Sequence, residues 1–189
     1  MTLRTLLAAA AAAVLFTGHA SAATTWNVVQ DQSRLGFTAT QQGGEFDGQF
    51  QRFKADMRFA ADDLAHSRFD VTVDIASVDT GSRQRDRYLP GGEWFDTDQY
   101  PKATFETTSF QHVDGDRFKA EGKLTIKGNT HPITLPFTWT TQGDAARMEG
   151  DVTLDRSNYK VGTGEWAAGD TVGLNVDVHV RLKLERATP

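Results

Sequence analysis

The residues best suited to chemistry lie together in one short stretch, Arg83 to Phe95, which reads RQRDRYLPGGEWF. Its first half holds three arginines and Asp86, and its second half holds Trp94 and Phe95 after a Pro-Gly-Gly break. A guanidinium group can pair two oxygens of a phosphate or carboxylate at once, and aromatic rings offer large apolar contact areas. The combination is typical of a site for an amphiphile with a polar head and an apolar tail.

Other patterns that could carry chemistry are weak. Val113 to Phe118, VDGDRF, lacks the terminal glutamate of a calcium loop, and the glycine-rich stretch at 162–170 is not expected to precede a helix that could hold a phosphate. Cysteine and the G-x-S-x-G motif are absent. The histidines after residue 22 fall in separate segments, without zinc-ligand spacing: His66, His112, His131 and His179. The sequence therefore predicts no catalytic residue, no metal site and no cofactor.

The first 22 residues are predicted to be a secretory signal peptide. Met1 to Ala22 carries one basic residue, Arg4, then an apolar run from Leu6 to Phe16, and ends in Ala-Ser-Ala. The run is too short to span a bilayer, and no later stretch approaches the roughly 18 apolar residues of a membrane helix. The remaining residues, 23–189, suit one domain. The exported chain most simply goes to the bacterial periplasm, and because it has no cysteine it is expected to carry no disulfide there.

The charge of the chain excludes nucleic acid as a partner. Of 20 basic residues, 19 remain once Arg4 is removed, against 25 acidic residues, so the net charge is −6. The basic residues are scattered and form no patch that could follow a phosphate backbone. The same balance argues against adhesion to anionic lipid headgroups.

Alternating hydrophobicity predicts an all-β fold. From Val172 to Leu184 every second residue is apolar, which indicates a long strand with one dry face. Similar alternation and hairpin signals at 113–116, 127–132 and 141–145 separate the other strands, and Phe46 to Phe59 forms one further strand segment. Long antiparallel strands with one apolar face most simply close into a barrel of about eight strands, because closure removes exposed edges.

Charged residues within the strands indicate that the apolar face points inward. An outer-membrane barrel has its apolar face outside, against lipid. Charged residues that alternate with the apolar ones instead suit an outer face in water. They are Lys54, Asp56, Arg58, Glu106, Lys119, Glu121 and Lys123. An eight-stranded barrel has an interior that either fills with side chains or holds one ligand. The pattern alone leaves both options open.

Five sequence blocks resemble the YceI-like family in order and spacing. They are VDIASVDTG (73–81), RDRYL (85–89), WFDTDQYPKATFE (94–106), GKLTIKGNTHPITL (122–135) and LDRSNYKVG (154–162). The resemblance implies a single lipocalin-like antiparallel barrel over residues 23–189 that holds a polyisoprenoid, such as a quinone or a polyprenyl phosphate, in its lumen. It also implies a b-type membrane cytochrome and a second copy of the chain as candidate partners. Many members carry histidine where this chain has Tyr88, so a contact through that histidine does not transfer.

On this reading, Asp79 to Phe95 crosses the barrel rim as a short helix and loop, and forms a lid. Arg85 and Arg156 are the candidates for contact with a head group, although Arg156 could instead tie a hairpin together through backbone carbonyls. Trp94 and Phe95 could likewise plug an ordinary core. The expected ligand-binding residues of the lumen and lid are Phe37, Phe46, Phe50, Val73, Ile75, Tyr88, Leu89, Trp94, Phe95, Phe105, Leu124, Ile126, Phe137, Trp139, Tyr159 and Trp166.

Three functions fit these expectations. The leading one is a non-enzymatic periplasmic carrier of an isoprenoid lipid. The second is an enzyme that acts on such an amphiphile through Asp86 or Asp96 at the mouth. The third is a binding module whose lumen is filled by its own side chains and whose rim aromatics, Trp94 and Trp166, recognise a sugar or a protein surface.

Overall fold

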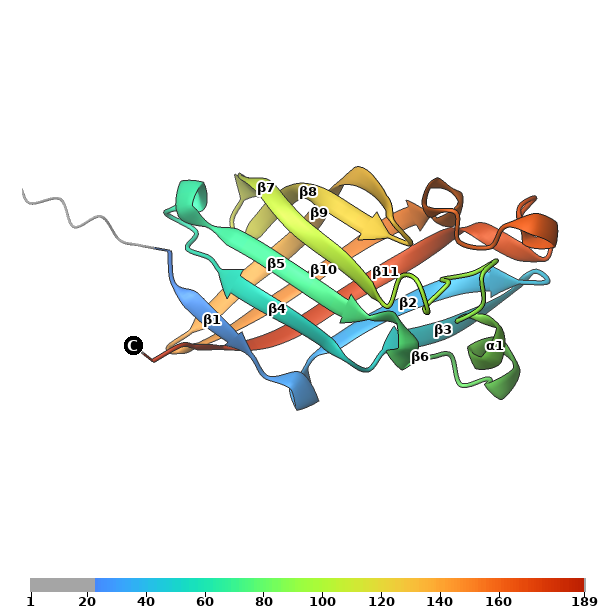
Figure 1. Ribbon diagram of the computed structural model, residues 1–189. Helices are drawn as coiled ribbons and strands as arrows, with labels where there is room; N and C mark the ends of the chain where they lie inside the picture. The colour runs from blue at the N-terminus through green and yellow to red at the C-terminus, as the bar shows by residue number, and fades with distance from the viewer. Residues whose placement is uncertain (1–22, 189) are drawn as a thin grey trace, which may run out of the picture.

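The computed structural model describes residues 23–188, so the expected signal peptide lies outside the described residues. These residues form an almost all-β structure in which eight antiparallel strands close into a barrel (Figure 1). This confirms the predicted fold class. Around the barrel the strands follow one another in the order β1 (Thr25–Val28), β4 (Phe53–Arg58), β5 (Arg68–Asp74), β7 (Lys102–Asp114), β8 (Arg117–Ile126), β9 (Asn129–Gln142), β10 (Ala145–Asp155) and β11 (Val172–Arg186).

The ring closes at one end only, because the edge of β11 that faces away from β10 has two partners along its length. Its last residues pair with β1, where Trp26 lies opposite Arg186, and β1 in turn pairs with β4. Its first part pairs with β2 (Arg34–Gln41), which continues into β3 (Gly44–Phe50) and β6 (Val78–Asp79). At that end the β2–β3 hairpin extends beyond the barrel (Figure 1).

The stretch Phe46 to Phe59, expected as one strand segment, is divided between β3 and β4. The chain turns at Gln51 and Arg52, whose backbone N–H groups donate to the carbonyl and the hydroxyl of Ser77. These bonds replace ladder bonds, and the chain changes neighbours from β2 to β5. The three predicted hairpin turns are confirmed; at the second, Lys127 and Gly128 both have positive φ, as a two-residue hairpin turn requires.

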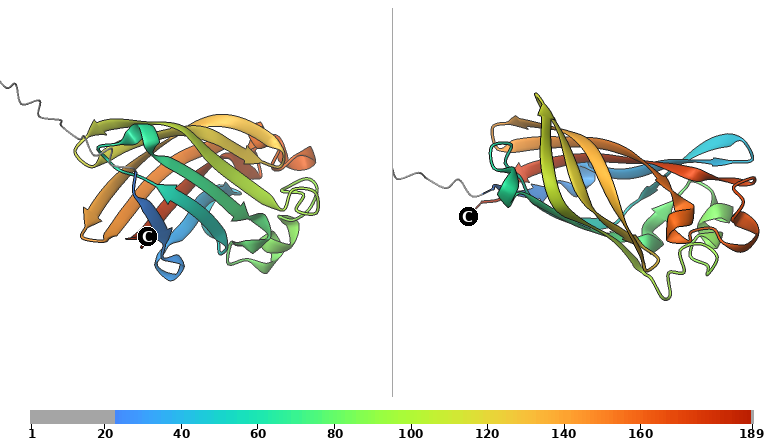
Figure 2. Two further views of the ribbon diagram at one scale, coloured as in Figure 1. Left: turned by 60° about the vertical axis from the view of Figure 1, so that its left-hand side comes forward. Right: turned by 90° about the horizontal axis from the view of Figure 1, so that it is seen from above.

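The helical segments are short, and most of them gather at the end where β2 and β3 extend beyond the ring, which we call the splayed end. The α-helix α1 (Arg83–Tyr88) begins at Ser82, whose hydroxyl accepts a hydrogen bond from the backbone of Arg85. Figure 2 shows α1 and the segment between β10 and β11 at the same end of the barrel, opposite the C-terminus. The 3-10 helices are η1 (Gln30–Gln32), η2 (Leu64–His66), η3 (Ile75–Ser77), η4 (Arg156–Tyr159) and η5 (Gly164–Trp166).

The closed end of the barrel is filled by large rings, which we call the aromatic plug. Phe59 lies at its centre, with ring centroids 4.6 Å from Trp139 and 5.2 Å from Phe118. Its five rings are those of Phe59, Phe69, Phe118, Phe137 and Trp139, all nearly inaccessible to solvent. Phe137 and Trp139 were expected to line a ligand site, and the structure places them in this plug instead.

The outward faces of the strands are charged, as the alternation predicts. Lys54, Asp56 and Arg58 on β4 point to solvent, whereas Met57 between them is buried. On β8, Lys119 and Lys123 are exposed, whereas Ala120 and Gly122 between them are buried. The apolar faces of the ring therefore meet inside the barrel.

Candidate ligand-binding cavity

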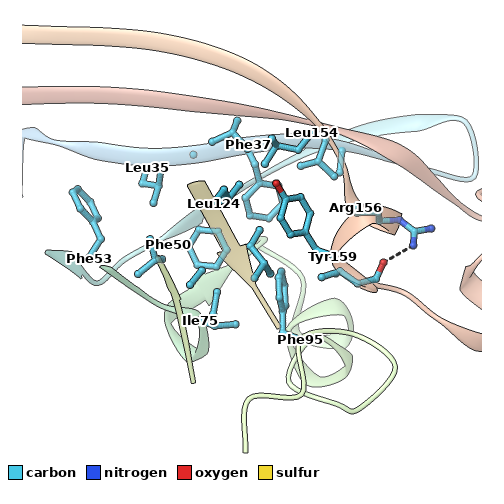
Figure 3. A pocket seen from close by; sticks show the side chains of 18 of the residues that line it. Leu35, Phe37, Phe50, Phe53, Ile75, Phe95, Leu124, Leu154, Arg156 and Tyr159 are labelled. Atoms are coloured by element: carbon cyan, nitrogen blue, oxygen red, sulfur yellow. Dashed lines mark hydrogen bonds between the residues drawn. The ribbon is translucent and has the colours of Figure 1, made fainter. Parts of the chain in front are cut away.

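An apolar cavity of about 370 Å³ lies between the aromatic plug and the splayed end. This volume falls in the range of small-molecule sites, roughly 300–1,000 Å³. Side chains from almost every strand of the ring converge on it, and Figure 3 shows Leu35, Phe53 and Ile75 pointing into it from different elements. The barrel interior is thus packed at one end and open space at the other.

Most of the predicted site residues line this cavity. The expected residues that the structure brings together there are Phe37, Phe46, Phe50, Val73, Ile75, Tyr88, Leu89, Trp94, Phe95, Phe105, Leu124, Ile126, Tyr159 and Trp166, with Arg85 and Arg156. They come from eight separate stretches of the chain, so only the closed sheet makes them neighbours. Their roles in binding stay predictions.

One wall of the cavity was missing from the predicted site. It is formed by aliphatic side chains of β2, β10 and β11: Leu35, Val152, Leu154, Val176, Val178, Val180 and Leu182. Their signal was present in the sequence, since the apolar positions of 172–184 alternate without interruption. Alternation marks the dry face of a strand, however, and does not separate the part that borders a void from the part that borders a neighbour.

Two glycines let aromatic rings of the cavity lie flat against the sheet. Gly48 is paired with Phe37 across β2 and β3, and a Cβ atom on Gly48 would lie 2.3 Å from that ring. Gly122, which is paired with Thr107, lies under the Phe105 ring, and a Cβ atom there would lie 2.6 Å from that ring. A ring that covers a glycine of a neighbouring strand is a recognised way to stabilise a sheet. Here it also keeps both rings at the wall and out of the lumen.

Arg85 fastens the lid helix α1 to the β2–β3 hairpin at the cavity mouth. Its guanidinium donates to the hydroxyl and the carbonyl of Thr80 and, at 3.2 Å, to the side-chain oxygen of Gln41. The same group lies 4.1 Å above the ring of Phe46. Asp86, named for the enzymatic alternative, accepts from the backbone N–H and the hydroxyl of Thr80. The charged residues of the lid thus hold it in place.

The second half of the lid rests on the segment between β10 and β11. The Glu93 carbonyl accepts from the backbone of Gly162 and Thr163, and its carboxylate accepts from the indole of Trp166. Lys127 donates to the carbonyls of Gly92 and Lys160, at 2.6 and 3.0 Å, and so bridges the two segments. Burial lowers the pKa of the Lys127 ammonium from its ordinary value, although Asp96 and Glu93 oppose this effect.

Arg156 holds the segment between β10 and β11 in place through hydrogen bonds to its backbone. It is only 5% exposed, and its five N–H groups donate to five backbone carbonyls, those of Val161, Gly162, Trp166, Val172 and Gly173. Burial lowers the pKa of its guanidinium, but arginine remains charged in proteins. The expected head-group contact is therefore corrected: a guanidinium has five N–H donors, and none is left for a ligand. The alternative, that Arg156 ties the hairpin together, describes its geometry.

Trp94 is buried in the lid. It is 9% exposed, lies 5.5 Å from the ring of Trp166 and is covered by the Arg156 guanidinium at 5.4 Å. Its indole nitrogen is enclosed and has no hydrogen-bond partner among residues 23–188. Tyr88, by contrast, is 59% exposed at the mouth. A rim surface built on Trp94 is thus not available to a sugar or a protein, and the cavity shows that side chains do not fill the lumen.

The four histidines of the described chain have separate partners and do not gather at one site. His131 packs against the Tyr159 ring. His66 contacts Asp63, His112 contacts the carbonyl of Gly115, and His179 lies between Thr38 and Asp151 on the outer surface. Between residues 23 and 188 no group of three or more histidines and acidic residues is placed to hold a metal ion. The cavity is thus lined by apolar side chains and a few hydrogen-bonding groups.

The structure is thus an eight-stranded, lipocalin-like barrel with one plugged end, an apolar cavity and a lid. A family model described as YceI-like domain matches residues 26–184. The chain belongs to the YceI-like family. Within the described residues, none of the helices is both long and apolar enough to span a bilayer.

Known relatives and solved structures agree with this assignment. Protein YceI of Shigella flexneri is 34% identical over 125 residues, which cover 62% of this chain and 65% of the relative, so the match spans less than two thirds of that protein. A UPF0312 protein of Photorhabdus laumondii is 30% identical over 85% of this chain and 89% of its own length. The crystal structure of Burkholderia cenocepacia BcnA has a TM-score of 0.81 and 31% identity, covering 86% of this chain and all of BcnA.

A more distant structure shares the fold alone. It is described as a polyisoprenoid binding domain from Saccharophagus degradans, with a TM-score of 0.66 and 15% identity over 88% of this chain and 99% of that domain.

Proposed function

We propose that this protein is a non-enzymatic carrier or sequestering protein that holds an isoprenoid lipid in its barrel lumen. The observation that supports this most directly is the cavity of about 370 Å³, which is lined almost entirely by apolar side chains and capped by a lid. The fold shared with the polyisoprenoid binding domain of Saccharophagus degradans agrees with it. The expected signal peptide supports the periplasm as its location.

The apolar lining is sufficient for tight binding of such a tail. Burial of one CH₂ group contributes roughly 0.8 kcal/mol, so a five-carbon isoprene unit contributes about 3–4 kcal/mol. Three or four units therefore match the ~12 kcal/mol of nanomolar affinity before ordering costs. On this proposal the tail sets the affinity. Transfer of a bound quinone to a b-type membrane cytochrome, and pairing of two copies of the chain, stay predictions from family resemblance.

Native mass spectrometry of the exported protein tests the proposal. We expect a co-purified lipid of several hundred daltons, or uptake of a prenyl quinone added after delipidation. A protein that is isolated free of lipid and takes up no prenyl quinone would contradict it. Slow conversion of the bound lipid by wild type, lost in Asp86→Asn with binding retained, would instead support the enzymatic alternative.

A further inference from the structure

The Tyr159 hydroxyl is a hydrogen-bonding group inside an apolar cavity. Tyr159 ends η4 at the splayed end of the barrel and is only 2% exposed. Figure 3 shows its ring reaching into the cavity with the oxygen foremost, on the side where Phe37 and Leu154 lie. Around it the lining is aliphatic or aromatic, including Leu124, Phe95 and Val172.

The hydroxyl has no hydrogen-bond partner within the part of the chain that the structure describes. Burial alone raises the pKa of Tyr159, with no hydrogen bond among the causes. The hydroxyl is therefore protonated at neutral pH and carries one donor that nothing in the barrel accepts. The Tyr159 oxygen is not among the fully enclosed unpaired atoms, so it borders the cavity. A ligand that fills the cavity must therefore accept this hydrogen bond or leave the hydroxyl unpaired, at a cost of about 1–3 kcal/mol.

The position of the ring is fixed by its surroundings. The Asp155 carboxylate caps η4 by accepting from the backbone of Ser157, and Asn129 donates to the Tyr159 carbonyl at 3.2 Å. His131 packs against the ring, with centroids 5.2 Å apart in a T-shaped arrangement. A donor held in this way needs no reordering when a ligand arrives, which favours a specific contact.

Within residues 23–188, both arginines that line the cavity are held by other groups. Arg156, which follows β10 just before Tyr159, uses all five N–H groups on backbone carbonyls, and Arg85 is engaged at the mouth with Thr80 and Gln41. A phosphate placed beside Tyr159 would be a buried charge without a counter-charge, which costs several kcal/mol. A neutral oxygen needs only one donor, which the Tyr159 hydroxyl supplies.

We propose that Tyr159 is a specificity-determining residue that donates a hydrogen bond to a neutral oxygen, such as a quinone carbonyl, of an isoprenoid held in the cavity. This inference rests on the proposed function and narrows it, because it favours a prenyl quinone over a polyprenyl phosphate with its head inside. A polyprenyl phosphate then binds through its tail, with its phosphate left in water at the mouth.

The test compares wild type with Tyr159→Phe, which removes only the oxygen, against three probes: a prenyl benzoquinone, a polyprenyl phosphate with the same tail, and squalene. Loss of one hydrogen bond, with the carbonyl left unpaired, is expected to weaken quinone binding by roughly 5- to 100-fold. Affinity for the phosphate and for squalene is expected to stay within about twofold of wild type. The infrared C=O band of bound quinone is expected to lie at lower frequency in wild type than in Tyr159→Phe.

Tyr100→Phe is the matched control, because Tyr100 does not line the cavity and removal of its hydroxyl deletes the same single atom. It is expected to leave all three affinities unchanged. Equal weakening of all three probes in Tyr159→Phe, or an unshifted C=O band, would overturn the role of Tyr159 while leaving the carrier function standing. Failure of wild type to bind any of the three probes would instead refute the proposed function itself.

Discussion

The two ends of the barrel are built from the same alternating strands and differ in what their inward residues do. At the plugged end, Phe59 contacts the rings of Phe69, Phe118 and Trp139 at centroid distances of 4.6 to 5.7 Å. At the splayed end, the inward side chains of β10 and β11 that line the cavity are mostly aliphatic, and the rings on the opposite wall, such as Phe50 and Phe53, do not reach them. The same binary pattern thus produces a packed core in one half and a binding site in the other, because side-chain volume decides whether opposite walls meet.

The lid shows the same division of roles. Its polar groups serve attachment: Arg85 joins α1 to the β2–β3 hairpin, and Glu93 accepts from the Trp166 indole. Lys127, from the β8–β9 turn, donates to the Gly92 carbonyl of the lid. The apolar groups of the lid, among them Leu89 and Phe95, face the cavity. Charge in this stretch therefore holds the cover in place, and ligand contact falls to the apolar side chains and Tyr159.

The largest expected effect is on stability at the plugged end. Phe59→Ala removes the ring at the centre of the plug and is expected to lower the free energy of unfolding by about 3–5 kcal/mol. Phe50→Ala at the cavity is expected to cost clearly less, because one side of that ring borders open space. Chemical denaturation of both variants measures the difference. Equal losses would contradict the division into a packed end and an open end.

The next effect is on binding at the splayed end. Val178→Trp places an indole in the cavity and is expected to displace about one isoprene unit, which lowers affinity for a prenyl quinone roughly 100-fold or more. Stability is expected to change little, because the added ring fills a void. Asn175→Trp, an exposed position on the same strand, is the control. Unaltered affinity in Val178→Trp would show that the ligand lies elsewhere.

A smaller effect is expected at the lid. Arg85→Ala removes the hydrogen bonds to Thr80 and Gln41, and since a hydrogen bond to a charged group contributes about 1.5–3 kcal/mol, release of bound quinone is expected to quicken about tenfold or more. Stopped-flow displacement measures the rate. Arg87→Ala is the comparison, because that side chain is exposed and donates only to the carbonyl of Arg83. Equal release rates in the two variants would contradict the role of Arg85 in holding the lid. An altered preference between quinone and phosphate in Arg85→Ala would instead support its predicted contact with a head group.

The smallest effect is a pH dependence that distinguishes the buried Tyr159 from an exposed tyrosine. Burial raises its pKa in the folded protein above the ordinary value of about 10, which holds in the unfolded chain. At a pH between these two pKa values, the unfolded chain has lost the proton that the folded chain keeps. Stability is unaffected below about pH 10 and falls as the pH rises beyond it. Unfolding free energies of wild type and Tyr159→Phe from about pH 8 to 11 are therefore expected to diverge in favour of the variant. Parallel curves would mean that the hydroxyl is not buried in solution.

The fold class and many of the residues that line the cavity could be predicted, because both depend on local patterns. Alternation at 172–184, the hairpin turn at Lys127 and Gly128, and the Pro-Gly-Gly break after Tyr88 each specify their own backbone. Phe137 and Trp139 were predicted at the cavity but lie in the aromatic plug. Alternation shows that a side chain points inward, and it does not show whether that side chain meets other side chains or a void. Arg156 was ambiguous for a related reason, since its five carbonyl partners come from a separate loop and strand.

The sequence by itself determined which face of each strand is apolar, where the chain turns and which stretch covers the rim, because these properties follow from neighbours along the chain. Only the tertiary structure decided that β1 closes the ring at one end, that five rings fill that end, and that the Tyr159 hydroxyl enters the cavity unpaired. Those features depend on volumes and partners contributed by residues far apart in sequence. No local pattern encodes the space that remains when such side chains meet.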